Sequence, residues 1–377
     1  MNEVYLDNSA TTRVDERVAQ AALSMMCEHY GNPSSLHSKG LDAELAITAA
    51  RKQVAAAIGA DAAEITFTSG GTEANNLAVF GTMNMGRRMG GRVIATAFEH
   101  SSVMASFAQL EKLGCEVIYI KPDGQGHISA RDVIDAVDNR TVLVSTMLVN
   151  NEVGSITPVE EIARGIRFKN KDTVIHCDAV QAFGKLPIKV KRLGVDLLTV
   201  SGHKIYAPKG IGALYVRAGV RLRPLVYGGS QERGLRVGTE AAPNIAALGK
   251  AAELIDCAHA IQNSSLFSKT LLEGVAGISG IHVNSPDDAL PCIVNISAVG
   301  IRSEIMMHYL EQRGIFVSSG SACAKGEKSH VLRSMGLSDD LIDSALRISF
   351  GKYNTCEDIA RFITVLKQGM KDIKRHA

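Results

Sequence analysis

The chain has 377 residues, of which 46% are hydrophobic, and this length favours one large and one smaller domain over a single core. Its 41 Lys and Arg nearly balance its 39 Asp and Glu, so the formal net charge is +2. That balance supplies no field for attracting nucleic acid or an anionic membrane, and the expected partner is a small molecule or another protein.

The spacing of the cysteines and the amino-terminal sequence indicate the cellular compartment that we expect for the protein. No two of the seven cysteines have C-x-x-C spacing, which argues against a zinc site and a disulfide framework, so no metal is expected. The opening "MNEVYLDNSATT" is acidic where a signal peptide is basic, and no apolar run reaches membrane-spanning length. These features predict a protein of the reducing cytoplasm that does not associate with membranes.

The first half of the chain alternates β-branched runs with helical stretches. Helices are expected at 72–88, 101–113, 129–138 and 158–169. Strands separated by helices imply crossover connections, so we predict an α/β fold whose large domain has a mostly parallel seven-stranded sheet flanked by helices. The strand candidates are "EITFTS", "GRVIATA", "CEVIYI", "TVLVSTM", "DTVIHCD", "VDLLTV" and "IGALYV".

The pattern changes near residue 240. The Ala-rich run "TEAAPNIAALGKAAELIDCAHAIQ" predicts one helix near 240–262 that bridges two domains. The strands "CIVNIS" and "ALRISFG" and amphipathic helices at 302–313 and 355–373 then predict a smaller α+β domain. The predicted boundaries are 14–256 for the large domain, and 1–13 with 257–377 for the small domain that carries the cysteine loop.

Polar groups follow several predicted strands, where ligands bind in parallel sheets. In "TSGGTEANN", Gly70, Gly71 and Thr72 lead from a strand into a helix and can direct N–H groups and a hydroxyl at an anion such as phosphate. The same residues also suit an ordinary helix cap. The chain has neither a Walker lysine pattern nor G-x-G-x-x-G, which counts against nucleoside triphosphates and dinucleotides.

Three further strand ends complete a pattern. "VIHCDAVQAFGK" places Asp178 at a strand end with Gln181 after it, "LTVSGHKIYAPKG" supplies Lys204, and "TAFEHSSV" supplies His100. Each has an ordinary structural alternative, such as a helix cap or a lysine that reaches solvent. A phosphate cradle, a carboxylate, a stacking imidazole and a lysine are together what pyridoxal phosphate requires: the lysine forms the Schiff base and the carboxylate keeps the pyridine nitrogen protonated.

Many motifs, in order along nearly the whole chain, resemble one family. The chain resembles the cysteine desulfurases of the NifS and IscS type, within the class V aminotransferase-like group of fold-type I pyridoxal-phosphate enzymes. The resemblance is specific because so many motifs occur in order. They are "YLDNSATT", "YGNPSSLHSKG", "TSGGTEANN", "FEHSSV", "VNNEVGSI", "HCDAVQAFGK", "SGHKIYAPKG", "QERGLRVGTE", "SSGSAC" and "LRISFG".

The resemblance implies a role for each matching residue. Lys204 would be the Schiff-base lysine, Asp178 would hold the pyridinium nitrogen, Gln181 would contact the phenolic oxygen, and His100 would stack on the ring. Arg347 would grip the substrate carboxylate, which its planar fork suits, with help from Asn151 and Asn32. The implied cofactor ligands are Gly71, Thr72, His100, Asn151, Asp178, Gln181, Ser201, His203 and Lys204, with Thr239 donated by the neighbouring subunit of a homodimer that shares its active sites.

Cys323, in the small-residue run "SSGSACAKGE", reads from the sequence alone as a thiol on an exposed, mobile loop. The resemblance implies that it takes sulfur from L-cysteine as a persulfide, leaving L-alanine, so that Lys204, Cys323 and His100 are the catalytic residues. Lys325 and Lys328 are expected to lower the pKa of the thiol modestly. The segment "AKGEKSHVLRSMGL" leaves the acceptor open between an iron–sulfur scaffold and a tRNA-thiolating enzyme.

Two alternatives remain at this point. A selenocysteine lyase or class V aminotransferase would use the same cofactor without needing Cys323. A noncatalytic sulfur-carrier or scaffold protein would keep the fold without a lysine-bound cofactor.

Overall fold

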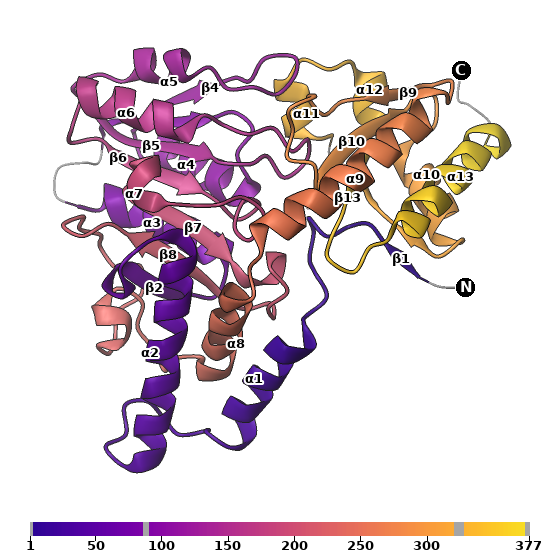
Figure 1. The fold of residues 1–377 in the computed structure, drawn as a ribbon. Coiled ribbons are helices and arrows are strands. Elements are labelled where there is room, and N and C mark those ends of the chain that lie inside the picture. Colours follow the sequence, from indigo (N-terminus) through magenta and orange to yellow (C-terminus); the bar gives the residue numbers. More distant parts are fainter. Residues whose placement is uncertain (1–2, 86–89, 320–327, 374–377) are drawn as a thin grey trace.

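The computed structural model describes residues 3–85, 90–319 and 328–373, and its centre is a seven-stranded sheet (Figure 1). Six of the strands run in one direction, and β8 alone is antiparallel to its two neighbours. This confirms the predicted, mostly parallel sheet. In spatial order the strands are β2 (Ile65–Thr68), β8 (Gly212–Val216), β7 (Leu197–Ser201), β6 (Val174–Asp178), β5 (Thr141–Met147), β3 (Arg92–Thr96) and β4 (Glu116–Ile120).

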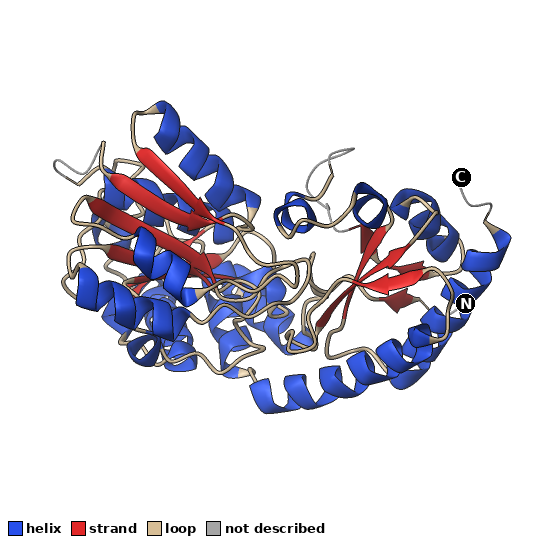
Figure 2. Ribbon diagram, turned by 90° about the horizontal axis from the view of Figure 1, so that it is seen from above, coloured by secondary structure: helices blue, strands red, loops and turns tan. Residues whose placement is uncertain are grey.

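Both faces of this sheet are buried. Neighbouring residues of a strand point to opposite sides of the sheet, and here each side is covered by a hydrophobic core. Ile94 and Val144 enter one hydrophobic core, whereas Val93 and Leu143 enter a second core on the other face. Figure 2 shows helices on both sides of the larger sheet. The helices of this part are α1 (Glu16–Cys27), α2 (Ser38–Ile58), α3 (Gly71–Met83), α4 (Ser101–Lys112), α5 (Ala130–Ala136), α6 (Val159–Lys169), α7 (Val190–Leu193) and α8 (Ala242–Glu253).

A smaller sheet lies beside the large one (Figure 2) and has its own core. Its strands are β12 (Ser318–Ser319), β13 (Ala345–Ser349), β10 (Ile293–Ala298) and β9 (Ile281–Val283), and β1 (Val4–Tyr5) pairs separately with β11 (Ile315–Phe316). The helices here are α9 (Cys257–Ala276), α10 (Ser303–Glu311), α11 (His330–Ser334), α12 (Asp339–Asp343) and α13 (Cys356–Asp372). The core draws on residues 4–6 and 267–370, and the exact domain boundaries stay a prediction.

The prediction of a single helix near 240–262 is wrong. The chain leaves α8 after Glu253 and begins α9 at Cys257. Asp256 lies outside the helical conformation and its carboxylate accepts a hydrogen bond from the His259 N–H at 3.0 Å, which caps α9. The bridge between the two parts is therefore a capped break between two helices.

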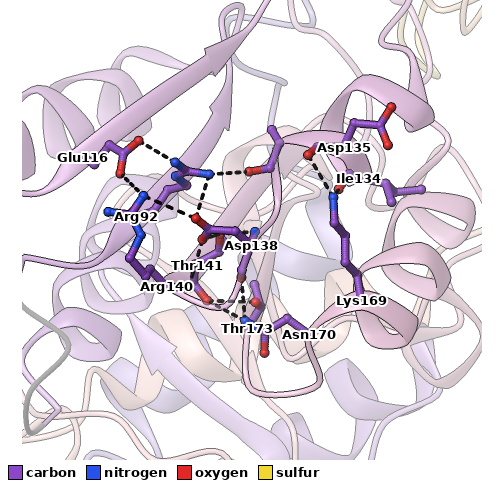
Figure 3. A network of polar contacts seen from close by, with 11 residues as sticks. Arg92, Glu116, Ile134, Asp135, Asp138, Arg140, Thr141, Lys169, Asn170 and Thr173 are labelled. Atoms are coloured by element: carbon purple, nitrogen blue, oxygen red, sulfur yellow. Dashed lines mark hydrogen bonds and ion pairs between the residues drawn. The ribbon is translucent and has the colours of Figure 1, made fainter.

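Charged side chains fasten the amino-terminal edge of the large sheet, opposite the strand ends discussed below (Figure 3). Arg92 at the start of β3 pairs with Glu116 of β4 at 2.7 Å and with Asp138 at 3.0 Å. Arg140 reaches the same two carboxylates at 2.9 and 3.3 Å. The network joins the starts of three strands.

Among the described helices, none is both long and apolar enough to cross a membrane.

Candidate active site

A cavity of about 580 Å³ lies at the carboxyl ends of the large sheet's strands. Side chains that follow β3, β5, β6 and β7 meet there with Arg347 of β13 in the small sheet, so both parts of the molecule form its wall. This is the position in which parallel α/β sheets bind ligands. The predicted residues that line it are Gly71, Thr72, His100, Asn151, Asp178, Gln181, Ser201, His203, Lys204 and Arg347.

Two predicted residues, Asn32 and Thr239, are not brought to this cavity. Asn32 lies exposed in a turn, where its Oδ1 accepts a hydrogen bond from Ser34 N at 2.9 Å. Thr239 is exposed and does not line the cavity of its own chain. Cys323 lies outside the described residues, as does Lys325. The roles expected for these residues stay predictions.

Lys204 is held at the cavity by the amino-terminal segment. It closes the short 3-10 turn Gly202–Lys204 after β7, and its Nζ donates to the carbonyls of Ser9 at 2.5 Å and Ala10 at 2.8 Å. The segment is fixed in turn because the Thr12 N–H and hydroxyl both donate to the His203 carbonyl at 2.9 Å. The amine is therefore oriented by backbone groups that lie almost 200 residues earlier in the chain.

The start of α3 forms a cradle against the end of β7. A Cβ on Gly71 would lie 3.0 Å from Val180 Cγ2, which would have to shift by a few tenths of an ångström, and at an ordinary contact distance of 3.6 Å from Ser201 Cβ, so glycine favours the close approach of this turn to Val180. The first N–H groups of a helix have no partner within it and suit an anion. Glu73 accepts from Ser69 N at 2.6 Å and from Arg236 Nε at 2.9 Å, and these bonds fix the turn that enters the helix.

Asp178 and Gln181 each carry a fixed set of bonds. Asp178 is buried, and its two carboxylate oxygens accept from Val180 N at 2.9 Å and Asn75 Nδ2 at 2.8 Å. Gln181 donates from Nε2 to the Ser9 carbonyl at 3.0 Å, while its Oε1 accepts from Lys185 Nζ at 2.8 Å. Burial is the main cause that lowers the pKa of Lys185.

Two histidines at the cavity favour the neutral form. Burial chiefly lowers the pKa of His100, with Lys204 and His330 acting in the same direction and Asp178 opposing them. Burial and the neighbouring Lys204 lower the pKa of His203 to about 4. Both imidazoles are therefore uncharged at neutral pH and suit contact with a planar ring or an anion as hydrogen-bond donors.

Arg347 reaches the cavity from β13 and is almost completely buried. Its Nη2 lies 2.8 Å from Asp7 Oδ1, and its Nη1 donates to the Asn151 carbonyl at 3.0 Å. These contacts orient the guanidinium fork, which matches the geometry of a carboxylate.

Residues 328–330 form another part of the wall. Lys328 pairs with Asp339 at 3.2 Å and Asp343 at 3.0 Å, so two carboxylates offset its charge. Ser329 donates to Glu152, whose pKa burial raises to about 7 against the opposing effects of Ser329 and Arg347. His330 bonds the Glu99 carbonyl at 2.9 Å. Three anchored side chains thus fix residues 328–330 at the cavity wall.

The donor set fits pyridoxal phosphate. Four cavity residues hold buried polar atoms with no hydrogen-bond partner among the described residues: Ser9 Oγ, Asn75 Oδ1, Asn151 Oδ1 and Arg347 Nε. Native structures rarely leave such atoms unsatisfied unless a ligand or water meets them. A lysine, a carboxylate, a neutral imidazole and a helix N-terminus around one cavity are the groups that this cofactor needs.

Sequence reasoning missed several residues that orient these groups. Asn75 and Ser102 stand inside the quoted motifs "TEANN" and "FEHSSV", and Lys185 ends "QAFGK". Their position within motifs was the only available signal, because their bonds depend on side chains brought together by the fold. No grouping of described His, Cys, Asp and Glu residues could hold a metal ion.

Comparison with known proteins agrees with this geometry. A family model described as aminotransferase class-V matches residues 4–362. The chain is 42% identical over 376 residues to a cysteine desulfurase IscS of Methanosarcina thermophila, which covers 98% of this chain and 93% of that protein. A solved NifS-like protein shares 36% identity and a TM-score of 0.94, covering 99% of this chain and all 100% of the other.

A structure described as SspA in complex with cysteine is also similar, with 36% identity, a TM-score of 0.83 and coverage of 94% of this chain and 100% of that one. The chain belongs to the class-V aminotransferase family. The resemblance to the NifS and IscS group that its motifs indicated is confirmed, and so is the α/β fold predicted from the alternation of strands and helices.

Proposed function

We propose that this protein is a pyridoxal-phosphate-dependent cysteine desulfurase. The observation that carries the proposal is the convergence of Lys204, Asp178 and the Gly71 cradle with Arg347 in one cavity. The first three suit the cofactor, and the arginine suits the carboxylate of an amino acid. The name of the similar cysteine-bound SspA structure supports L-cysteine as the substrate.

The cofactor, when bound, supplies an electron sink for the negative charge that develops at the substrate Cα. Gly71, Thr72, Ser201 and His203 would hold its phosphate, and Asp178 would keep the proton on its pyridine nitrogen. Lys204 would carry it covalently and then move the Cα proton. The Ser9 and Ala10 carbonyls that hold Lys204 Nζ keep this amine directed into the cavity.

Arg347 would bind the substrate carboxylate beside Asn151. Its Nε has no partner among the described residues, although Nη1 and Nη2 are occupied. Asp7, which pairs with Nη2, would orient the guanidinium before substrate binds and would move aside when the bidentate contact with the substrate carboxylate forms. Asn32 would help from a position that the single chain does not bring to the cavity.

Cys323 would complete the reaction. Its thiolate takes the sulfur atom of L-cysteine, so that the substrate C–S bond breaks, an S–S bond forms, and the products are L-alanine and a persulfide on Cys323. The persulfide would then pass to an acceptor protein, either an iron–sulfur scaffold or a tRNA-thiolating enzyme.

A homodimer is part of the proposal. The loop between α1 and α2 lies at the lower end of the molecule in Figure 1, and this region exposes large apolar side chains, with Leu36 fully exposed. A second copy is the partner we expect on this surface. The exposed side chains are Leu23, Met26, Tyr30, Leu36, Leu41 and Leu45.

The six described cysteines are all free, which supports a reducing cytoplasm as the location.

The deciding experiment measures alanine and sulfide formed from L-cysteine with a reductant, for the cofactor-loaded protein and its Cys323→Ala variant. We expect both products from the parent and loss of turnover in the variant. Equal activity in both would reject the persulfide step and favour a selenocysteine lyase or aminotransferase. Lys204→Ala should remove the yellow, borohydride-reducible chromophore, and a colourless parent protein would favour a noncatalytic carrier.

A further inference from the structure

Four buried or partly buried side chains form one hydrogen-bonded line along the cavity wall. Asp178 Oδ2 lies 2.8 Å from Asn75 Nδ2, which lies 2.9 Å from Ser102 Oγ, which lies 2.8 Å from His100 Nδ1. The members come from the end of β6, from α3 and from the start of α4. Asn75, Ser102 and Asp178 expose 1%, 8% and 3% of their surface, so water competes little for these bonds.

The direction of this line follows from the chemistry of its members. An ionised carboxylate only accepts, so Asn75 must turn its amide nitrogen, which has two hydrogens, toward Asp178. The second hydrogen of the same nitrogen goes to Ser102 Oγ. Because that oxygen accepts from Asn75, its own hydrogen is left for His100 Nδ1. The opposite orientation of Asn75 would place two acceptors 2.8 Å apart.

A second bond supports the same state of the imidazole. The Ser102 backbone N–H also donates to His100 Nδ1, at 3.2 Å. A nitrogen that receives two donated hydrogens carries no proton, so the proton of the neutral ring is on Nε2, on the opposite side of the imidazole. Three titratable groups act on the charge of His100: Lys204 and His330 disfavour its charged form, and Asp178, the carboxylate of the line, favours it.

We propose that Asn75 and Ser102 are positioning residues that couple Asp178 to His100, so that the ionised carboxylate fixes His100 as the Nε2-protonated imidazole. The inference deepens the proposed function, on which it rests for the contact of Asp178 and His100 with the cofactor. The protonation state of Asp178, which holds the pyridine nitrogen, and that of His100, which covers the ring, are then fixed by the same hydrogen bonds. His100 is presented with an N–H to donate rather than a lone pair to accept protons.

The test is nitrogen NMR of the cofactor-loaded dimer labelled with ¹⁵N-histidine, with His100→Gln used to assign the signal. The imidazole nitrogens of the two neutral forms have clearly different shifts. We expect an unprotonated Nδ1 and a protonated Nε2 between pH 6 and 8. A protonated Nδ1 in the parent protein would overturn the proposal, whether or not the protein releases sulfur from cysteine.

Variants then test the coupling. Asn75→Asp replaces the amide, whose nitrogen donates twice, with a carboxyl that shares one proton with Asp178 and accepts the Ser102 hydrogen through its other oxygen. His100 Nδ1 is then left to donate, so the pKa of His100 should rise. Because the new carboxyl also changes the electrostatic field at the ring, Asn75→Asp is compared in the Ser102 and Ser102→Ala backgrounds. We expect a clearly smaller rise without the hydroxyl, and equal rises would overturn the coupling.

Ser102→Ala alone keeps the test decisive if Asn75→Asp does not fold. One donor to Nδ1 is then lost, so the two ring-nitrogen shifts should move toward each other, and unchanged shifts would contradict the proposal. Ser106→Ala is the matched control: Ser106 is also buried on α4, and its hydroxyl bonds the Ser102 carbonyl at 2.8 Å without joining the line. This variant should leave the His100 signals unchanged.

Discussion

Lys185 is a buried lysine that donates to the amide of Gln181 rather than to a carboxylate. By occupying Gln181 Oε1, it leaves Nε2 as the group available to an acceptor in the cavity. We predict that Lys185→Met weakens pyridoxal phosphate binding about tenfold, since leaving a buried acceptor unpaired costs about 1–3 kcal/mol. Titration of the apo protein followed by absorbance measures this. Lys189→Met, at an exposed lysine nearby, should bind as the parent does, and unchanged affinity in both variants would refute the role of Lys185.

His176 makes stability depend on pH. It is fully buried in β6 between Ser145 Oγ at 2.9 Å and Thr199 Oγ1 at 3.0 Å, and burial lowers its pKa from 6.5 to about 4. Between these two pH values the unfolded chain binds a proton that the folded chain does not, so stability falls as pH falls from 6.5 toward 4.

The loss from His176 alone should approach about 3 kcal/mol near pH 4. Urea unfolding at pH 7 and pH 5 measures it, and His176→Gln should show a shallower decline than the parent. His259→Gln, at an exposed histidine, should keep the parent's slope. If all three proteins lose stability in parallel, His176 is not responsible.

At the scale of elements, the turn Gln231–Gly234 contains two residues in the left-handed region, Glu232 with φ 46° and Arg233 with φ 58°. Such conformations cost about 1–3 kcal/mol each without glycine. Glu232 offsets this cost because its buried carboxylate accepts from Arg51 at 2.6 and 2.7 Å and from Phe67 N at 3.0 Å. The turn is thereby fastened to β2, which leads into the cradle.

Removing this carboxylate should destabilise the fold strongly. We expect Glu232→Ala to lower the free energy of unfolding by about 3 kcal/mol, the usual cost of breaking a buried pair. Chemical denaturation with and without cofactor gives the value. Glu161→Ala, at an exposed acid on α6, should change stability by less than about 0.5 kcal/mol, and a similarly small effect at Glu232 would refute the assignment.

The elements themselves were largely predictable. Each of the seven β-branched runs became a strand of the large sheet, because short apolar runs between helical stretches are typical of strands that are buried on both faces. The break near Asp256 was missed because the alanine-rich residues on both sides favour one continuous helix. The bond from His259 N to Asp256, which caps the second helix, is known only from the structure. The cavity residues were found through motifs, whereas Asn75, Ser102 and Lys185 act through contacts between distant segments that periodicity does not encode.

For the whole molecule, the proposed dimer predicts that one active site uses Lys204 of one subunit and Thr239 of the other. A purified heterodimer of Lys204→Ala and Thr239→Val subunits would then hold one intact site and one doubly altered site. We expect about half of the parent turnover per dimer. If each site uses its own Thr239, the heterodimer should instead reach only half the rate of the Thr239→Val homodimer.

The amino-terminal segment has a consequence for the biosynthesis of the protein. Ser9 and Ala10 hold Lys204, and Asp7 pairs with Arg347, 340 positions later. Asp7 therefore meets Arg347 only after 340 further positions have been translated, much later than Ser9 and Ala10 can meet Lys204. Because such long-range contacts form slowly, we expect a nascent chain to acquire its cofactor only after β13 has been synthesised, and a prematurely terminated chain lacking β13 to be delivered to proteolysis without one.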